Sequence, residues 1–237
     1  MTRPRAASER FVAQLPTRVK SRVQVIYSPV MEIRPTADAI EVGGVQGLIF
    51  TSANAVNAAA SKGVDRNLPA FCVGPVTTGT AKGFGWRAKM VGATAEELVG
   101  HLLKCRPETP LLHLRGQHTR GDVAGRLTES GLTVREQPVY QQRLLPLTSE
   151  ANGAADGKLP IVAPLFSPRS ARHFADVWVG SAPLWLAAIS QATADPLYSL
   201  DYARLKIAKE PTPQKMRKAV KKLVKHVLRV EGGVVPD

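Results

Sequence analysis

The chain alternates short aliphatic segments with helical segments along almost its whole length. The short segments are rich in Val, Ile and Leu, which favours strands that are buried on both faces. Strands separated by helices predict parallel sheets covered by helices, so the predicted fold class is α/β. The predicted strands are Val23–Tyr27, Gly47–Phe50, Ala70–Val73, Ala88–Val91, Leu111–Leu114, Val134–Tyr140, Ile161–Phe166, Trp185–Ile189 and Lys206–Ala208.

Helical segments fill most of the intervals, and two of them begin at capping signals. Thr94-Ala-Glu-Glu97 has the spacing of a capping box, in which a hydroxyl and a carboxylate satisfy amides at the helix start. Thr212-Pro213 combines an N-cap threonine with proline at the first helical position. The predicted helices are Ala53–Ser61, Ala95–Cys105, Asp122–Glu129, Arg169–Trp178 and Pro213–Val230.

One pattern occurs twice at a nearly constant spacing. Residues 49–56 read IFTSANAV and residues 165–172 read LFSPRSAR, each an apolar run ending in Phe, then a hydroxyl residue and a helix. The match continues in order at other places, among them Val73–Thr77 with Ile189–Thr193. We interpret this as an internal duplication, with one copy at about 1–107 and the other at about 108–237.

Two extended, proline-bounded segments occupy equivalent places in the two copies. They are Tyr27–Pro35 and Gln137–Pro146. We expect both to be crossover strands that run from one spatial domain to the other.

The chain has 237 residues and a formal net charge of +13, and its C-terminal helix carries about half of the excess. The apolar residues of this helix fall at helical spacing, so one face can dock while a basic face stays solvated. A nucleic-acid footprint is the alternative interpretation of that face. The seven basic residues are Lys215, Arg217, Lys218, Lys221, Lys222, Lys225 and Arg229.

Familiar catalytic and targeting signals do not occur in the sequence. It has no GxxxxGK[ST], HExxH or GxSxG motif, and its five histidines lack metal-ligand spacing, so we expect no metal site and structural or surface roles for them. Gly83–Ala88 has GxGxxA spacing but follows a helix, which predicts a turn. Two isolated cysteines, no signal peptide and no membrane-length apolar run favour a cytoplasmic protein.

Hydroxyl residues recur where a predicted strand ends and a helix begins. N-capping alone would explain each of them. Together, in two copies expected to face a cleft, they predict a site for a ligand with many carboxylates or phosphates, because helix-terminal amides bind anions. Arg3 and Arg115 could add positive charge at the same rim. The hydroxyl residues are Thr51, Ser52, Thr77, Ser167, Ser170 and Thr193.

Taken in order, several short motifs resemble those of the uroporphyrinogen-III synthase family. They are Thr2-Arg3-Pro4, Ser28–Ile33, Phe50–Val56, Val73–Thr77, Leu127–Gly131 with Val139-Tyr140, and Phe166–Ser170. The chain departs from the family pattern in two places. The apolar strand expected before Thr2 is missing, so one domain is expected to lack a strand or to begin upstream, and Ser190-Gln191 replaces a usual Gly-Pro.

The resemblance implies two flavodoxin-like, doubly wound parallel-sheet domains joined by a two-stranded linker. Domain 1 would combine residues 1–33 and 145–237, and domain 2 would comprise 36–138. The implied reaction closes hydroxymethylbilane to uroporphyrinogen III with inversion of ring D, in a cytoplasmic monomer without cofactor, metal, nucleic acid or membrane. Tyr140 is the catalytic candidate. The substrate-binding candidates are Arg3, Thr51, Ser52, Gly74, Thr77, Arg115, Ser167, Ser170 and Thr193.

Two other classes of function stay open at this point. A non-catalytic, two-domain anion-binding protein would use the same hydroxyls, although such receptors usually carry a signal peptide. A nucleic-acid binder would use the lysine-rich helix, but the helix lacks interleaved aromatic residues for base stacking.

Overall fold

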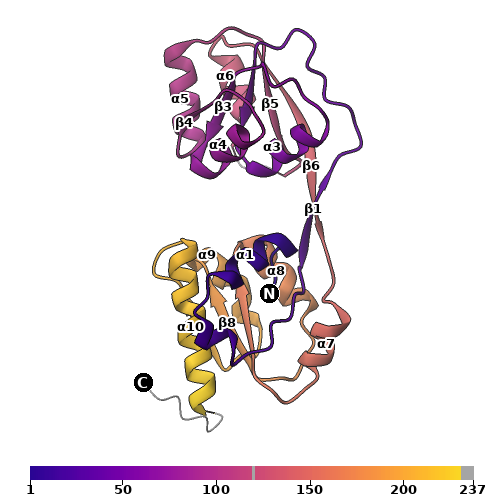
Figure 1. Ribbon diagram of the computed structural model, residues 1–237, viewed down its shortest axis with the longest axis vertical. Helices are drawn as coiled ribbons and strands as arrows, with labels where there is room; N and C mark the ends of the chain where they lie inside the picture. Colours follow the sequence, from indigo (N-terminus) through magenta and orange to yellow (C-terminus); the bar gives the residue numbers. More distant parts are fainter. Residues whose placement is uncertain (119–120, 231–237) are drawn as a thin grey trace. The chain divides into compact units, whose positions relative to one another are not determined.

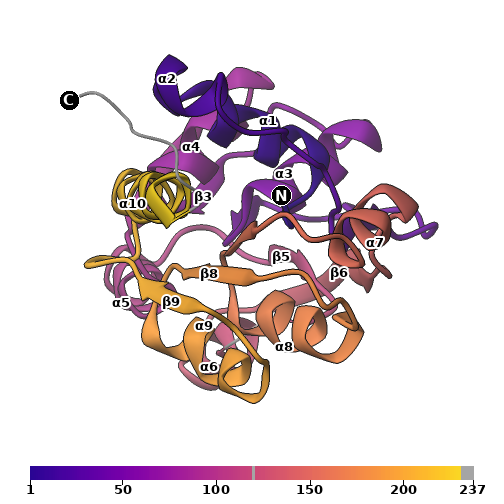
Figure 2. The same ribbon diagram turned by 90° about the horizontal axis from the view of Figure 1, so that it is seen from below.

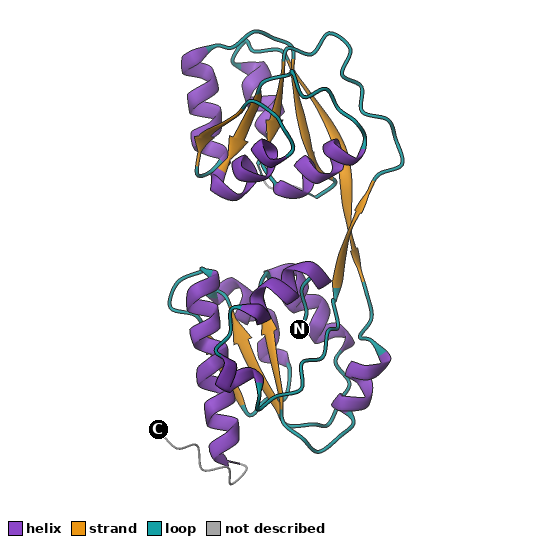
Figure 3. Cartoon of the chain, in the orientation of Figure 1, coloured by secondary structure: helices purple, strands orange, loops and turns teal. Residues whose placement is uncertain are grey.

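The computed structural model describes residues 1–118 and 121–230, which form two compact units (Figures 1 and 3). Unit 1 is Met1–Glu32 with Arg143–Asp237, of which residues 231–237 lie outside the described part. Unit 2 is Ile33–Gln142. The chain therefore enters unit 2 once and leaves it once.

Both connections are β-strands. The division between the units falls inside β1 (Met31–Pro35) and inside β6 (Val134–Leu144), which are neighbours in one sheet (Figure 3). The amide of Thr36 donates to the carbonyl of Val139 at 3.0 Å, and the amide of Leu145 donates to that of Val30 at 3.0 Å. The predicted two-stranded linker is confirmed.

Unit 2 is built around a parallel sheet. Beyond β1, the strand order is β6-β5-β2-β3-β4, and each pair from β6 to β4 is parallel. These strands are β2 (Gly47–Phe50), β3 (Ala70–Val73), β4 (Ala88–Gly92) and β5 (Leu111–Gly116). The helices are α3 (Ala53–Ser61), α4 (Gly74–Gly83), α5 (Ala95–Cys105) and α6 (Val123–Glu129).

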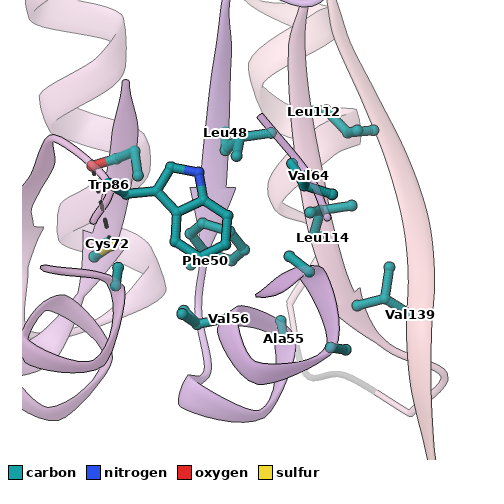
Figure 4. Packing of buried hydrophobic residues seen from close by; sticks show 14 of the residues in the cluster. Leu48, Phe50, Ala55, Val56, Val64, Cys72, Trp86, Leu112, Leu114 and Val139 are labelled. Atoms are coloured by element: carbon teal, nitrogen blue, oxygen red, sulfur yellow. Dashed lines mark hydrogen bonds between the residues drawn. The ribbon is translucent and has the colours of Figure 1, made fainter. Parts of the chain in front are cut away.

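Alternating side chains of the unit 2 strands bury two separate cores. Leu48, Phe50 and Leu112 face α3 and α4, and Phe50 meets Trp86 edge to face with ring centroids 5.4 Å apart (Figure 4). Ile49 and Leu111 point the other way, against α5 and α6. The sheet is therefore covered on both faces, as the apolar character of its strands predicts.

Unit 1 has a smaller parallel sheet in the order β7-β8-β9. On one face lie α8, α9 and the 3₁₀ helix η1, and on the other lie α1, α2 and α10 (Figure 2). The strands are β7 (Ile161–Leu165), β8 (Leu184–Ala188) and β9 (Arg204–Ile207). The helices are α1 (Arg5–Ala13), α2 (Thr17–Lys20), α7 (Ser149–Ala155), α8 (Pro168–Val177), α9 (Gln191–Ala194), η1 (Asp195–Ser199) and α10 (Pro213–Val230).

One predicted strand is wrong. Val23–Tyr27 has no regular secondary structure and belongs to neither sheet. The residues that follow this segment form hydrogen bonds with the first two residues of the chain. The amide of Ser28 donates to the carbonyl of Met1, and the amide of Val30 donates to the carbonyl of Thr2. A pairing of so few residues makes no continuous ladder, although the apolar composition of the segment suits a strand.

The predicted α/β class with doubly wound parallel sheets is confirmed. The internal duplication stays a prediction. Within residues 1–118 and 121–230, none of the helices combines the length and apolar character needed to cross a membrane.

Candidate active site

The strand order of unit 2 reverses between β2 and β5. The chain continues from β2 to β3 on one side, whereas β5 lies on the other side of β2. In open parallel sheets, ligands bind outside the carboxyl ends of the strands at such a switch point. Thr51 and Ser52 follow β2, and Arg115 and Gly116 end β5. Three of the predicted binding residues, Thr51, Ser52 and Arg115, therefore lie at the switch point.

The hydroxyl of Ser52 caps α3. It accepts a hydrogen bond from the amide of Asn54 at 3.1 Å, and its backbone is extended as N-caps require. The next strand passes into α4 at Gly74, whose φ of 75° is in the left-handed region that favours glycine. Thr77 lies in the first turns of α4 and is only 6% exposed. Two helices thus begin at this edge of the sheet.

Arg115 does not present a free charge. Its guanidinium forms an ion pair of 2.5 Å with Glu136 on β6 and also donates to the carbonyl of Gly116 at 3.0 Å. Both charged residues line a shallow hollow of about 390 Å³, together with Gln117, His118, Gly121 and Asp122. A carboxylate that approached Arg115 would compete with Glu136, so the contribution of this arginine to binding depends on that ion pair.

Tyr140 lies on β6 with its ring buried against the α3 face of the core. Its register partner is Gly116, at a point where the pairing of β5 and β6 shifts between Arg115 and Gly116. A Cβ atom on Gly116 would lie 2.6 Å from Cζ of the tyrosine ring and 2.8 Å from its hydroxyl oxygen. The ring therefore occupies the space that any larger residue at position 116 would need.

The sequence alone does not show whether His113 lies in the core or at the surface. It is 2% exposed, and its Nε2 lies 3.2 Å from the hydroxyl oxygen of Thr51. Burial lowers the pKa of this imidazole from 6.5 to about 4; Glu136 raises the pKa and Arg115 lowers it, both to a lesser extent. The ring is thus neutral at neutral pH. A histidine inside the apolar run LLHL was the available signal.

The buried His113 makes unit 2 sensitive to acid. Because the folded-state pKa lies below the unfolded value, the native state binds fewer protons, so this contribution to stability is complete above about pH 6.5 and is lost as the pH falls toward about 4. We expect a loss of roughly 3 kcal/mol in the free energy of unfolding over that range. His113→Leu should remove that part of the pH dependence, measured by urea unfolding at several pH values. An unchanged pH slope in the variant would contradict this assignment.

In unit 1 the predicted hydroxyls bond to other serine hydroxyls of the protein. Ser167 caps α8 by accepting from the amide of Ser170 at 3.2 Å, and the two hydroxyls also share a short hydrogen bond. Thr193 is fully buried and bonds to the hydroxyl of Ser190 at 3.0 Å. All three predicted residues follow β7 or β8, at the carboxyl edge of the sheet of unit 1.

Arg3 lies at the same edge of unit 1. Its guanidinium carbon is 4.8 Å from the centroid of the Phe166 ring, directly before Ser167. Burial, and to a lesser extent Arg10, lowers the pKa of Arg3. A hollow of about 590 Å³ in unit 1 lies elsewhere. It is lined by Trp178–Leu184, up to the first residue of β8, and by Ser199–Ala203, which precede β9. It includes none of the predicted binding residues.

Among the described residues, no three His, Cys, Asp or Glu side chains are grouped in a way that could hold a metal ion. The expectation that the protein needs no metal or cofactor stays a prediction.

Two parallel α/β units, each with helix-capping hydroxyls at the carboxyl edge of its sheet, define a class of two-domain α/β protein. Residues 15–218 match the family model described as uroporphyrinogen-III synthase HemD. The chain belongs to this family. Members are cyclising enzymes of the lyase type in heme biosynthesis, and this is the activity of the chain.

One solved structure agrees with this assignment at the level of the fold. The chain is similar to uroporphyrinogen-III synthetase from Helicobacter pylori, with a TM-score of 0.65 and 19% identity over 84% of this chain and 95% of that one. A uroporphyrinogen III synthase from Thermus thermophilus is also similar, with a TM-score of 0.41 and 14% identity over 98% of this chain and 100% of that one. No curated protein sequence matches the chain.

Proposed function

We propose that the substrate is hydroxymethylbilane and that the enzyme closes it to uroporphyrinogen III with inversion of ring D. The observation that supports this substrate is the set of hydrogen-bond donors at the carboxyl edge of unit 2, beside the switch point of its sheet. A linear tetrapyrrole carries carboxylates along its length, and helix-terminal amides and hydroxyls bind such groups without a dense cluster of positive charge. A net charge of +13 favours the encounter.

In this proposal the protein acts mainly on the conformation of the substrate. Loss of hydroxide from the terminal carbon leaves an electrophilic azafulvene. A substituted pyrrole carbon of ring D attacks it to give a spiro intermediate, which rearranges to the type III ring. Free substrate closes to the wrong isomer unaided, so the enzyme must hold ring D where only inverted attack is reachable. We assign the binding to Arg3, Thr51, Ser52, Gly74, Thr77, Arg115, Ser167, Ser170 and Thr193.

Tyr140 is the proposed catalytic residue. Its ring is buried on the linker strand β6, and the described residues offer its hydroxyl no hydrogen-bond partner. A phenol held by its ring with a free O–H can donate to a departing hydroxide or to ring D.

The proposal extends to the state of the protein. We expect a cytoplasmic monomer that works without cofactor or metal and binds neither nucleic acid nor membrane. Units 1 and 2 would correspond to the predicted domains, residues 1–33 with 145–237 and residues 36–138. A solvated basic face on α10 accounts for half of the net positive charge without a macromolecular partner.

Product identity tests the proposal. With freshly made hydroxymethylbilane, and with chelator present, the purified protein should form type III uroporphyrinogen. The uncatalysed reaction is the internal control, because free substrate closes to the type I isomer, and chromatography of the oxidised products separates the two. Type I product at the spontaneous rate, from folded protein, would exclude this substrate and leave an anion-binding role.

A further inference from the structure

The Thr51–His113 pair lies at the switch point of unit 2. Thr51 directly follows β2, and the parallel pairing of β2 with β5 sets Ile49 opposite His113. The histidine projects to the same face as Leu111, among the apolar side chains that contact α5 and α6. Thr51 is only partly buried, so its hydroxyl lies at the edge of the sheet while it contacts the buried ring of His113.

The surroundings of the other ring nitrogen, Nδ1, indicate which partner donates in the hydrogen bond between His113 and Thr51. Nδ1 of His113 is buried and has no hydrogen-bond partner among the described residues. If the ring proton were on Nδ1, an N–H donor would be orphaned in an apolar core, which proteins tolerate less than an orphaned acceptor. If it is on Nε2, only a lone pair is left unpaired. The neutral ring therefore favours the Nε2–H form.

This direction determines what the threonine can do. An Nε2–H group donates to the Thr51 hydroxyl oxygen, so the hydroxyl keeps its own proton for an acceptor outside the protein. In the opposite tautomer the threonine would donate into the core and present only lone pairs, which repel carboxylates. A substrate recognised through carboxylates needs the first arrangement.

We propose that His113 is a positioning residue that fixes the Thr51 hydroxyl as a hydrogen-bond donor toward a carboxylate of the substrate. The inference rests on the proposed function for the nature of the ligand, but the direction of the hydrogen bond is a property of the resting protein. His113 acts only through Thr51 and is not expected to touch the substrate.

Steady-state kinetics at neutral pH test the coupling. Thr51→Val removes the hydroxyl, and His113→Leu removes the ring donor with a side chain suited to its apolar surroundings. Each should raise KM about five- to tenfold, as expected for one hydrogen bond, with kcat within about twofold. The double variant should be no worse than Thr51→Val alone. His113→Gln, whose amide N–H can stand near the position of Nε2, should recover most of the lost affinity.

Two outcomes would overturn the proposal. One is additive effects of the two substitutions on KM. The other is an Nδ1–H tautomer, observed in long-range proton–nitrogen correlation spectra of histidine-labelled protein at neutral pH. Thermal unfolding of His113→Leu serves as the control for folding, and its midpoint should not fall. Failure of the proposed function is recognised separately, because unmodified protein would then make no type III product while the spectra still report the tautomer.

Discussion

Ending the chain after Glu210 should leave unit 1 unable to fold. This truncation removes α10, whose apolar stripe packs on the face of the sheet formed by Trp185 and Ala187 (Figure 2). Four large side chains of the helix are buried there, and each contributes about 1.5–3 kcal/mol through burial, or roughly 6–12 kcal/mol together. That is comparable to the whole stability of a typical domain. The four are Met216, Val220, Leu223 and Val224.

A matched control separates the two faces of α10. Lys218→Gln with Lys222→Gln changes two exposed cations and should leave stability within about 0.5 kcal/mol. Circular dichroism and proteolysis would follow unit 1. A stable chain truncated after Glu210 would show that α10 contributes charge rather than core.

The helices and strands that could be predicted are those whose signals are local. Apolar spacing and a capping residue define α3, α5 and α10. Both bounds of α3 and α5 and the first residue of α10 agree with the prediction residue for residue. In the capping box of α5 the amide of Glu97 donates to the Thr94 hydroxyl at 3.2 Å, as predicted. The carboxylate of Glu97, however, accepts from the amide of Ala93 at 2.8 Å, one residue earlier than the motif implies.

The features that the sequence did not predict depend on pairing between strands that are distant in the chain. Val23–Tyr27 has the composition of a strand, but a strand also needs a partner, and composition carries no information about one. The same holds for Arg115, which was predicted as an available charge. Its ion pair with Glu136 arises from the pairing of β5 with β6 and depends on their register.

The candidate site shows the same limit. Its strand-end hydroxyls could be located from their place after apolar runs, whereas the side chains that surround them could not. His113 contacts Thr51 because β2 and β5 are neighbours in the sheet. In the sequence, however, β3 and β4 lie between these two strands. Which strands become neighbours is a property of topology, so this hydrogen bond could be recognised only in the folded chain.

Gly116→Ala should slow the enzyme strongly while leaving most of the chain folded. The new methyl group would lie 2.6 Å from Cζ of Tyr140, well inside van der Waals contact, so the tyrosine ring must leave its position. Overpacking of this kind costs about 1–3 kcal/mol of stability. Because the ring carries the proposed catalytic hydroxyl, we expect the rate of type III formation to fall by about tenfold or more. Product chromatography and urea unfolding measure the two effects.

Three variants identify the cause of that loss. Gly100→Ala adds a methyl group within α5 where nothing lies within 4 Å, and it should leave activity intact with stability unchanged or raised by about 0.5 kcal/mol. Tyr140→Phe keeps the ring and removes only the hydroxyl, so its rate should fall about five- to thirtyfold without the stability loss. Gly116→Ala combined with Tyr140→Val relieves the contact and should recover stability but no activity. If Gly116→Ala retained full activity, the position of the Tyr140 ring would have no part in catalysis, and the proposed role of its hydroxyl would fall with it.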